Sequence, residues 1–313
     1  MAYSENVASS PDDLIDKIST FAVSAGWTED RNDLVSTNRT VTLHKGGDYI
    51  HLWNDSDNGV KVIGSIGYDS GEVPTNQTLG ANNACVAPIG VGPYTKVYMF
   101  ADNSPAEHVH VVIEATSGVF FHLSFGLLDK FGSYTGGTYF DASYWPHVSA
   151  GAQSFSGFYN KAIFDSTWGT ATAAGLVPAN VRLDIAADGL SNSWFHANSA
   201  AAARLFTSLC GNGVGLPSPA LNAAYYRNSA TFSGQVLLQP IQVTALRTGG
   251  FWSPIGAFPN VRVTNMERYN PADEITIGSD VWKIFPFIRK GSSANTTTEA
   301  YSQNMAYAYK KVT

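Results

Sequence analysis

The sequence predicts a β-rich α+β protein, with an N-terminal helix packed on an antiparallel meander sheet and a second β-rich half after it. Three observations lead to this fold class. One segment near the N-terminus has the apolar spacing of a helix, whereas most other apolar residues alternate with polar ones, as in strands. The chain also contains 29 Gly, 17 Phe and 15 Tyr residues, which is typical of sheets joined by tight turns.

The helix is predicted to begin at residues 10–13, Ser-Pro-Asp-Asp. The serine is a suitable N-cap, the proline fits the first helical position, and the two acids face the positive end of the helix dipole. The apolar residues that follow share one helical face: Leu14, Ile15, Ile18, Phe21, Ala22 and Ala25. Gly26 is expected to end the helix, with Trp27 packed beneath it.

Three strands are expected to follow as a meander, with the helix across one face. Residues 41–44 and 49–53 alternate in hydrophobicity on either side of a glycine turn at 45–48, and a third strand is expected at 60–68. Residues 69–93 are rich in Gly, Asn and Pro and lack periodicity. They are expected to form a long ordered loop or an extension toward a neighbouring chain.

The segment 119–140 is expected to be the centre of the first half. Residues 119–125 place Val, Phe, Leu and Phe on one strand face and Phe, His and Ser on the other. Together with strands expected at 94–101 and 108–114, they should lie at or near the middle of a sheet of about five antiparallel strands. The glycines that follow are expected at bends covered by aromatic rings: Gly126, Gly132, Gly136 and Gly137.

Residues 1–150 are expected to form the helix and its sheet, and residues 151–313 a second β-rich region with a C-terminal extension; a single compact unit is the alternative. In the second region, residues 180–196 predict a hairpin and residues 199–209 predict a short helix. Further strands are expected at 231–238, 241–247, 261–265, 275–277 and 281–285. The last strand, 301–312, alternates Tyr with Ala and suits pairing with a distant sheet or another subunit.

Composition and charge exclude several function classes. The formal net charge of −6 argues against nucleic acid as a partner, because phosphate binding needs concentrated Lys and Arg, and the 19 basic residues are scattered. Residues 1–10 lack the basic and apolar regions of a secretory signal, and no apolar run approaches the ~18 residues of a membrane span. We therefore expect a protein that is made in a cytoplasm and has no membrane partner.

The low charge content also indicates a kind of environment. Only 14% of residues are charged, whereas about a quarter is usual in soluble domains. Such a surface must be covered by small polar and aromatic residues. This balance is common in β-rich proteins whose surface is completed by protein neighbours in a permanent assembly.

Histidines are the candidate metal ligands. His108 and His110 share one strand face, and His122 lies on the next strand. An even-numbered turn would point His122 to the opposite face, whereas an odd turn such as 116–118 would bring all three together. The alternative is that they are structural or surface histidines. His44 and His51, which flank a hairpin, are expected on a strand surface.

No catalytic residues, metal or cofactor are predicted. The sequence contains no G-x-S-x-G elbow, phosphate-binding loop, H-E-x-x-H motif or dinucleotide-binding glycine fingerprint. Carboxylate pairs such as Asp141 with Glu114 are easy to find among 25 acidic residues and do not indicate a glycosidase. We therefore expect that the protein is not an enzyme.

Aromatic residues in loop-like surroundings and on the terminal strand are candidates for an interface. They are Trp145, Tyr225, Tyr226, Trp252, Tyr307 and Tyr309. Aromatic rings are common at protein interfaces and at sugar-binding surfaces. The alternative is that they fill corners of the core.

Several motifs resemble those of virion structural proteins of tailed bacteriophages. They are the segments 13–17 and 25–28, the segment Leu43-His44-Lys45-Gly46-Gly47-Asp48-Tyr49-Ile50-His51, the segments 122–126 and 134–137 with Lys130 and Gly132, and Ile277-Gly278-Ser279-Asp280 with Phe285-Pro286. The resemblance extends over most of the chain.

The resemblance implies a virion component, made in the host cytoplasm, that assembles as a symmetric ring or collar at the neck or tail. Its partners would be further copies of itself and other virion proteins, with no cofactor or catalytic residues. A baseplate or fibre-associated protein that binds a receptor or glycan is the alternative. A hydrolase of cell-wall polysaccharide is a third class, which requires a pair of catalytic carboxylates.

Overall fold

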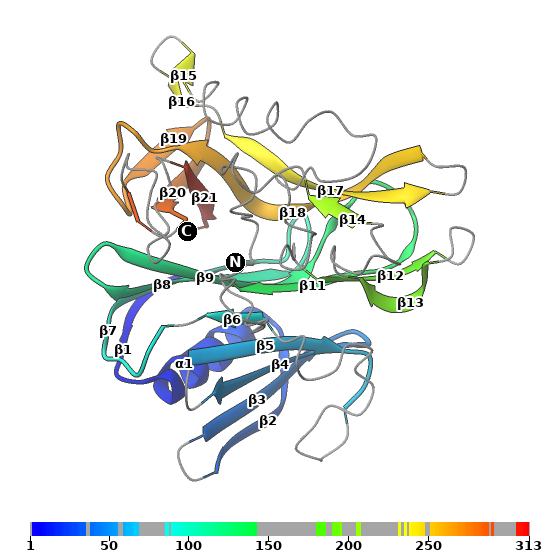
Figure 1. The fold of residues 1–313 in the computed structure, drawn as a ribbon, viewed down its shortest axis with the longest axis horizontal. Coiled ribbons are helices and arrows are strands. Elements are labelled where there is room, and N and C mark those ends of the chain that lie inside the picture. Colours follow the sequence, from blue (N-terminus) through cyan, green and yellow to red (C-terminus); the bar gives the residue numbers. More distant parts are fainter. Residues whose placement is uncertain are drawn as a thin grey trace, which may run out of the picture.

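The computed structural model describes residues 2–35, 38–55, 59–68, 85–87, 89–142, 180–185, 190–195, 205–207, 231–232, 235–236, 238–247, 251–287, 289–290 and 305–312. This described part confirms the predicted fold class, because it is a β-rich α+β protein with antiparallel sheets and one helix. Figure 1 shows three layers: the helix with sheet B, the central sheet A, and sheet C on the opposite side of sheet A.

Sheet A, the central layer, has seven strands. In spatial order they are β1 (Ala2–Ala8), β7 (Tyr94–Asp102), β8 (His108–Thr116), β9 (Val119–Leu127), β11 (Thr135–Ala142), β12 (Asn180–Ile185) and β13 (Leu190–Phe195). Strand β9 is therefore the middle strand, as predicted, but of a sheet larger than the expected five strands. The sequence analysis missed β1, because its polar residues form an edge strand whose side chains are mostly half-buried.

Sheet B contains the predicted meander. Its strands are β2 (Thr28–Val35), β3 (Asn38–Lys45), β4 (Asp48–Asp55), β5 (Gly59–Ser65) and β6 (Cys85–Ala87), in this spatial order. The β3–β4 turn pairs Lys45 with Asp48 around two glycines, as predicted. Strands β2 and β6 at the two edges were not predicted. Of the segment 69–93, residues 69–84 lie outside the described residues.

Sheet C also has seven strands, and the two-stranded ribbon β15 (Thr231–Phe232) and β16 (Gln235–Val236) is separate from it. Its main order is β14 (Leu205–Thr207), β17 (Gln239–Arg247), β18 (Phe251–Asn265), β21 (Met305–Lys311), β20 (Asp280–Pro286) and β19 (Glu274–Ile277), and β10 (Asp129–Lys130) also pairs with β18. Strand β14 corrects the short helix predicted at 199–209, since its three residues pair with β17. The alanines of that segment favour a helix, and the sheet contact overrides this preference.

The helix α1 (Pro11–Ser24) forms as the sequence predicts. The Ser10 side chain accepts a hydrogen bond from the backbone nitrogen of Asp13 at 3.2 Å. The predicted apolar face is buried against sheets A and B: Leu14, Ile15, Ile18, Phe21 and Ala22. The chain leaves the helix at Gly26, whose φ of 90° is a conformation that favours glycine.

The two faces of sheet A are buried in two separate cores. The lower core joins one face to α1 and sheet B through residues such as Val109, Val111 and Phe125. The upper core joins the other face to sheet C through residues such as Phe100 and Phe120. A third, smaller core around Trp282, Ile284, Ala306 and Ala308 covers the outer face of sheet C. Strand β9 therefore lies between two layers, and both of its faces are buried.

Strands from the two predicted regions pair with each other. Strand β12 of the second region continues sheet A beside β11, and β10 of the first region pairs with β18. The boundary expected near residue 150 lies outside the described residues. The division into 1–150 and 151–313 stays a prediction.

Candidate functional site

All three candidate histidines lie on the same face of sheet A. In the antiparallel pair of β8 and β9, His110 lies opposite Ser124 and Val112 lies opposite His122. Directly opposite residues point to the same face of a sheet, and so do alternate residues along one strand. His108 therefore shares this face, which packs against sheet C.

A bulge at the end of β8 produces this arrangement. The turn between β8 and β9 has two residues, 117–118, and a two-residue turn alone would point His122 to the opposite face. The register shifts by one residue between Glu114 and Thr116, so Ala115 is an extra residue in β8. The bulge and the turn together count as an odd loop, and this meets the condition stated from the sequence.

Gly126 brings β9 close to the start of β8. Its φ is 151°, and a Cβ added there would lie 2.4 Å from the carbonyl oxygen of Glu107 and 2.6 Å from the Cα of His108. Neither distance is possible for a real Cβ, so a larger residue would push the two strands apart. The predicted bend is therefore a close backbone contact inside β9, which continues to Leu127.

His122 joins sheet A to sheet C through both ring nitrogens. Its Nε2 lies 3.0 Å from the carbonyl oxygen of Pro286 on β20, and because a carbonyl only accepts, Nε2 carries the proton. Its Nδ1 then accepts the hydroxyl hydrogen of Tyr309 on β21 at 2.8 Å. The Tyr307 ring packs edge-on against the imidazole. Burial lowers the pKa of His122 to about 4, so the ring is neutral at neutral pH.

His110 makes the same kind of connection one row away. Its Nε2 donates to the carbonyl oxygen of Pro259 on β18 at 2.8 Å, so its Nδ1 accepts from the Ser124 hydroxyl at 2.9 Å. The ring is completely buried. Burial, followed by the neighbouring His108 and His122, lowers the pKa of His110 well below its ordinary value.

His108 contacts its own loop instead of sheet C. Its Nδ1 lies 2.8 Å from the carbonyl oxygen of Ala106, and its ring lies 4.7 Å from the His110 ring between centroids. Burial lowers the pKa of His108 to about 4, although the Ala106 carbonyl and the charges of Asp102 and Glu107 act in the opposite direction. His108 therefore supports the position of His110 without linking the two sheets.

The polar face continues onto β11. Asp141 lies opposite Ser124, and Tyr139 lies opposite Gly126, so both point toward sheet C. Both are buried. Burial and then the charge of Asp141 raise the pKa values of Tyr139 and Tyr309 well above the ordinary tyrosine value. We call the following side chains the polar layer: His108, His110, His122, Ser124, Tyr139, Asp141, Tyr307 and Tyr309.

The ring nitrogens of the polar layer have separate partners and do not converge on one point. The hydrogen bonds of His110 and His122 go to backbone carbonyls and hydroxyl groups on different strands. Within the described ranges, no group of three or more His, Cys, Asp or Glu side chains is placed to hold a metal ion. The shared face of the three histidines thus serves the contact between sheets.

The polar layer also contains the elements of a nucleophile and a base. Ser124 lies within hydrogen-bond distance of His110, and Asp141 lies on the next strand. None of these three side chains is more than 3% exposed, and the other nitrogen of His110 is bonded to the Pro259 carbonyl. In this conformation a substrate in solution does not reach the Ser124 hydroxyl. The geometry supports docking of the two sheets.

His51 forms a second buried cluster, within sheet B. The Ser65 hydroxyl donates to the Gly67 carbonyl at 2.6 Å, so it accepts from His51 Nε2 at 2.7 Å. His51 Nδ1 then accepts from the Thr42 hydroxyl at 3.0 Å. Burial, with a smaller effect of Arg31, lowers the pKa of His51 to about 4. The expected surface position of His51 is therefore wrong, because these two hydroxyl groups allow a neutral imidazole to be buried.

The structure describes the side chains of two of the six aromatic interface candidates. Tyr307 and Tyr309 are buried in the core between sheets A and C, because β21 lies between β18 and β20 of its own chain. Trp252 lies on β18, but its side chain is outside the described part. The remaining candidates lie outside the described residues: Trp145, Tyr225 and Tyr226.

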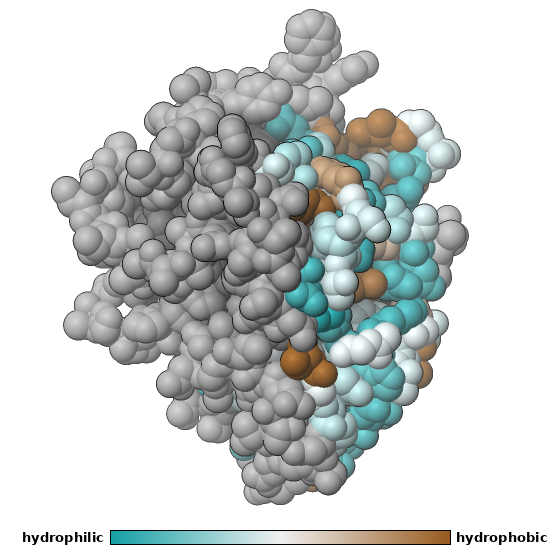
Figure 2. Space-filling model, turned by 90° about the vertical axis from the view of Figure 1, so that its right-hand side faces the viewer, coloured by the Kyte–Doolittle hydropathy of each residue, from teal (hydrophilic) through white to brown (hydrophobic). Residues whose placement is uncertain are grey.

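Two valines near the edge of sheet A are the most exposed large apolar side chains among the described residues. Val91 is 79% exposed and Val7 is 65% exposed. They flank a close backbone contact, since a Cβ added at Gly92 would lie 2.7 Å from the carbonyl oxygen of Ser9. The sequence gave no signal for this pair, because the two residues are 84 positions apart. On the face shown in Figure 2, the described hydrophobic residues lie in small groups among hydrophilic ones.

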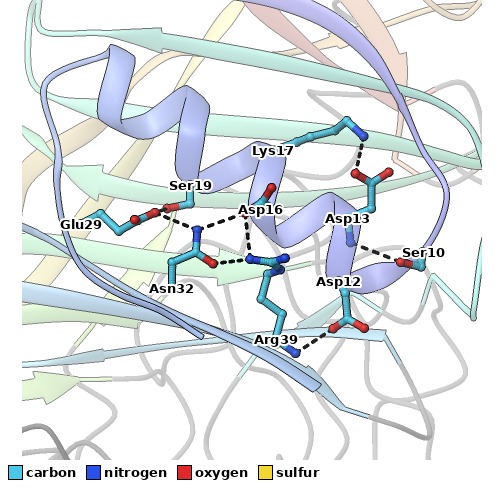
Figure 3. A network of polar contacts seen from close by, with 9 residues as sticks. All are labelled: Ser10, Asp12, Asp13, Asp16, Lys17, Ser19, Glu29, Asn32 and Arg39. Atoms are coloured by element: carbon cyan, nitrogen blue, oxygen red, sulfur yellow. Dashed lines mark hydrogen bonds and ion pairs between the residues drawn. The ribbon is translucent and has the colours of Figure 1, made fainter. Parts of the chain in front are cut away.

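A polar network fastens α1 to sheet B (Figure 3). Asp12 accepts from the backbone nitrogen of Arg39 at 2.7 Å, and Asp16 accepts from the Arg39 guanidinium at 2.8 Å. The Asn32 amide donates to both Asp16 and Glu29 at 3.0 Å. These acids have partners on β2 and β3, so the network sets the position of the helix on the sheet.

A search of known protein families and of curated proteins finds no match to this chain. The one helix of the described part is too short to cross a bilayer.

Proposed function

We propose that this protein is a structural component of a tailed-phage virion that assembles with copies of itself into a symmetric ring or collar at the neck or tail. The proposal rests first on the sequence resemblance to virion structural proteins. Its partners would be other copies and other virion proteins.

The position of the resembling motifs is the observation that carries the proposal. The segments 13–17 and 25–28 belong to α1 and its C-terminal turn, 43–51 is the β3–β4 hairpin, and 122–126 is the middle of β9. These are framework elements that bury apolar residues or join layers. The resemblance therefore concerns the scaffold, as is expected for a protein whose role is mechanical.

The surface supports self-association. Val7 and Val91 expose apolar side chains at the same edge of the molecule, and only 14% of residues are charged. Apolar side chains that are exposed close together favour contact with another protein. The polar groups best suited to chemistry in the described part instead join sheets A and C.

Light scattering of the purified protein, coupled to size-exclusion chromatography, tests the proposal. We expect an oligomer, or a monomer that associates with other virion proteins when they are mixed. Antibody labelling of imaged particles should then place the protein at the neck or tail. A stable monomer that associates with no virion protein would overturn the proposal, and saturable binding to host polysaccharide would favour a receptor-binding role.

A further inference from the structure

Two imidazoles carry hydrogen bonds between sheets A and C. His110 bonds to the carbonyl of Pro259 on β18, and His122 bonds to the carbonyl of Pro286 on β20 and to the hydroxyl of Tyr309 on β21. The partners lie 149, 164 and 187 residues away along the chain. Three strands of sheet C are thus tied to β8 and β9 through groups that can titrate.

The observed hydrogen bonds require neutral imidazoles. In both rings Nδ1 accepts, from the Ser124 hydroxyl in His110 and from the Tyr309 hydroxyl in His122. An imidazolium ion has no acceptor nitrogen, so protonation would force both hydroxyl groups to reverse. It would also place positive charge on two buried rings, which is costly without a partner.

The surroundings oppose a charge on these rings. The ionisable groups that face the rings or their immediate neighbours are His108 on β8, Asp102 and Glu107 beside His108, Tyr139 and Asp141 on β11, Tyr307 and Tyr309 on β21, and Lys283 on β20. His108 and His122 both oppose protonation of His110. Asp102 and Glu107 act on His108, and Lys283 is paired with Glu5 and Glu274 at the edge of the sheets.

We propose that His110 and His122 form an acid-sensitive latch between sheets A and C. Protonation of the two rings releases sheet C from sheet A, while α1 and sheet B stay packed on the opposite face. That opposite face carries apolar residues such as Val109, Val111 and Phe125, so its packing does not depend on a titrating ring. The latch goes beyond the proposed function and does not depend on it.

Hydrogen–deuterium exchange of the full chain between pH 7 and pH 4, with labelling times corrected for the intrinsic exchange rate, tests the latch. The peptides to compare are those of β18, β20 and β21 in sheet C and those of α1. We expect the sheet C peptides to lose protection at a higher pH than the α1 peptides. Loss of protection in all of them at one common pH, or in α1 first, would overturn the proposal.

Glutamine variants separate titration from packing. In His122→Gln and His110→Gln the amide can donate to the carbonyl and accept from the hydroxyl, but it does not take up a proton. With a latched pKa of about 4 and a released pKa of about 6.5, each histidine favours release about 30-fold at pH 5, and each variant should remove that factor. The matched control is His44→Gln, because His44 is partly exposed and pairs with Asp30.

The two outcomes of the variant experiment are distinct. A sheet C that keeps its protection to lower pH in the glutamine variants, with no change in His44→Gln, supports the latch. Release of sheet C at the wild-type pH in both latch variants would refute it. If the variants do not fold, nitrogen-15 spectra of the wild-type rings decide: the latch requires neutral rings with the proton on Nε2 at pH 7, and imidazolium rings at that pH would refute it.

Discussion

The two faces of sheet A are both buried, but they are held in different ways. The lower face contacts α1 and sheet B through apolar side chains from residues 2–142 alone. The upper face contacts strands up to 187 residues away, and it adds hydrogen bonds from imidazole, hydroxyl and phenol groups to its aromatic contacts. Apolar contacts are not directional, whereas a hydrogen bond is made only in one register. The difference indicates that distant segments are positioned by polar pairs, and local segments by apolar burial.

Acid should have the largest effect on this difference. The pKa values of His51, His108 and His122 are about 4 in the folded protein and about 6.5 when exposed, so the unfolded chain binds more protons between these values. Stability should be complete above about pH 6.5 and fall as the pH decreases toward 4, by about 2 kcal/mol for each histidine by pH 5. Urea unfolding followed by fluorescence at several pH values measures the loss. A free energy of unfolding that is constant from pH 7 to 5 would contradict it.

A cavity in the lower face should have the next largest effect. Phe125 is fully buried and packs edge-on against Trp27, with ring centroids 5.1 Å apart. Phe125→Ala should lower the free energy of unfolding by about 3–5 kcal/mol at any pH between 5 and 7. The control is Phe131→Ala, because Phe131 is 50% exposed and should cost less than about 1 kcal/mol. Equal losses in the two variants would show that the lower face is not a packed core.

Truncation of one ring in the upper face should have a smaller effect. His122→Ala leaves the Pro286 carbonyl and the Tyr309 hydroxyl without this partner, at a cost of about 2–4 kcal/mol at pH 7. Tyr309→Phe removes only the hydroxyl and should cost about 1 kcal/mol. Thermal unfolding at pH 7 measures both variants. If Tyr309→Phe costs as much as His122→Ala, the importance of the imidazole has been overestimated.

The ion pairs at the edge of sheets A and C should have the smallest effect. Burial alone would raise the pKa of Glu5, but hydrogen bonds from Lys96, Tyr3 and Lys283 outweigh it and lower the pKa to about 2. Because these groups are partly exposed, Glu5→Gln should cost only about 0.5 kcal/mol, and salt should reduce this further. Unfolding at low and high ionic strength checks it. A loss that does not change with salt would point to packing and not to charge.

Much of the framework could be predicted from sequence because its signals are local. Helix α1 has a capping serine, a proline at the correct position and one apolar face, and all three features appear as expected. The strands β3, β4 and β9 alternate clearly. The polar edge strands β1 and β2 lack such alternation, and pairing with a neighbour decides their structure.

The polar layer could be predicted only in part. The sequence places His108 and His110 on one face, but the position of His122 depends on a bulge at Ala115 that no residue pattern marks. The hydrogen-bond partners of the rings are backbone carbonyls, which are present at every residue and therefore carry no sequence signal. The burial of Tyr307 and Tyr309 likewise follows from where β21 pairs, and not from the Tyr-Ala alternation alone.

The mixed character of the upper face has a consequence for synthesis on the ribosome. The first five strands of sheet A and all of sheet B are encoded by residue 142, whereas β21 ends only at Lys311. At typical translation rates, those remaining residues take roughly 10–30 s to emerge. During that interval the upper face of the nascent sheet is in water, where imidazole, hydroxyl and carboxylate groups remain solvated. A nascent domain with such a face is less prone to aggregate than one with an entirely apolar face.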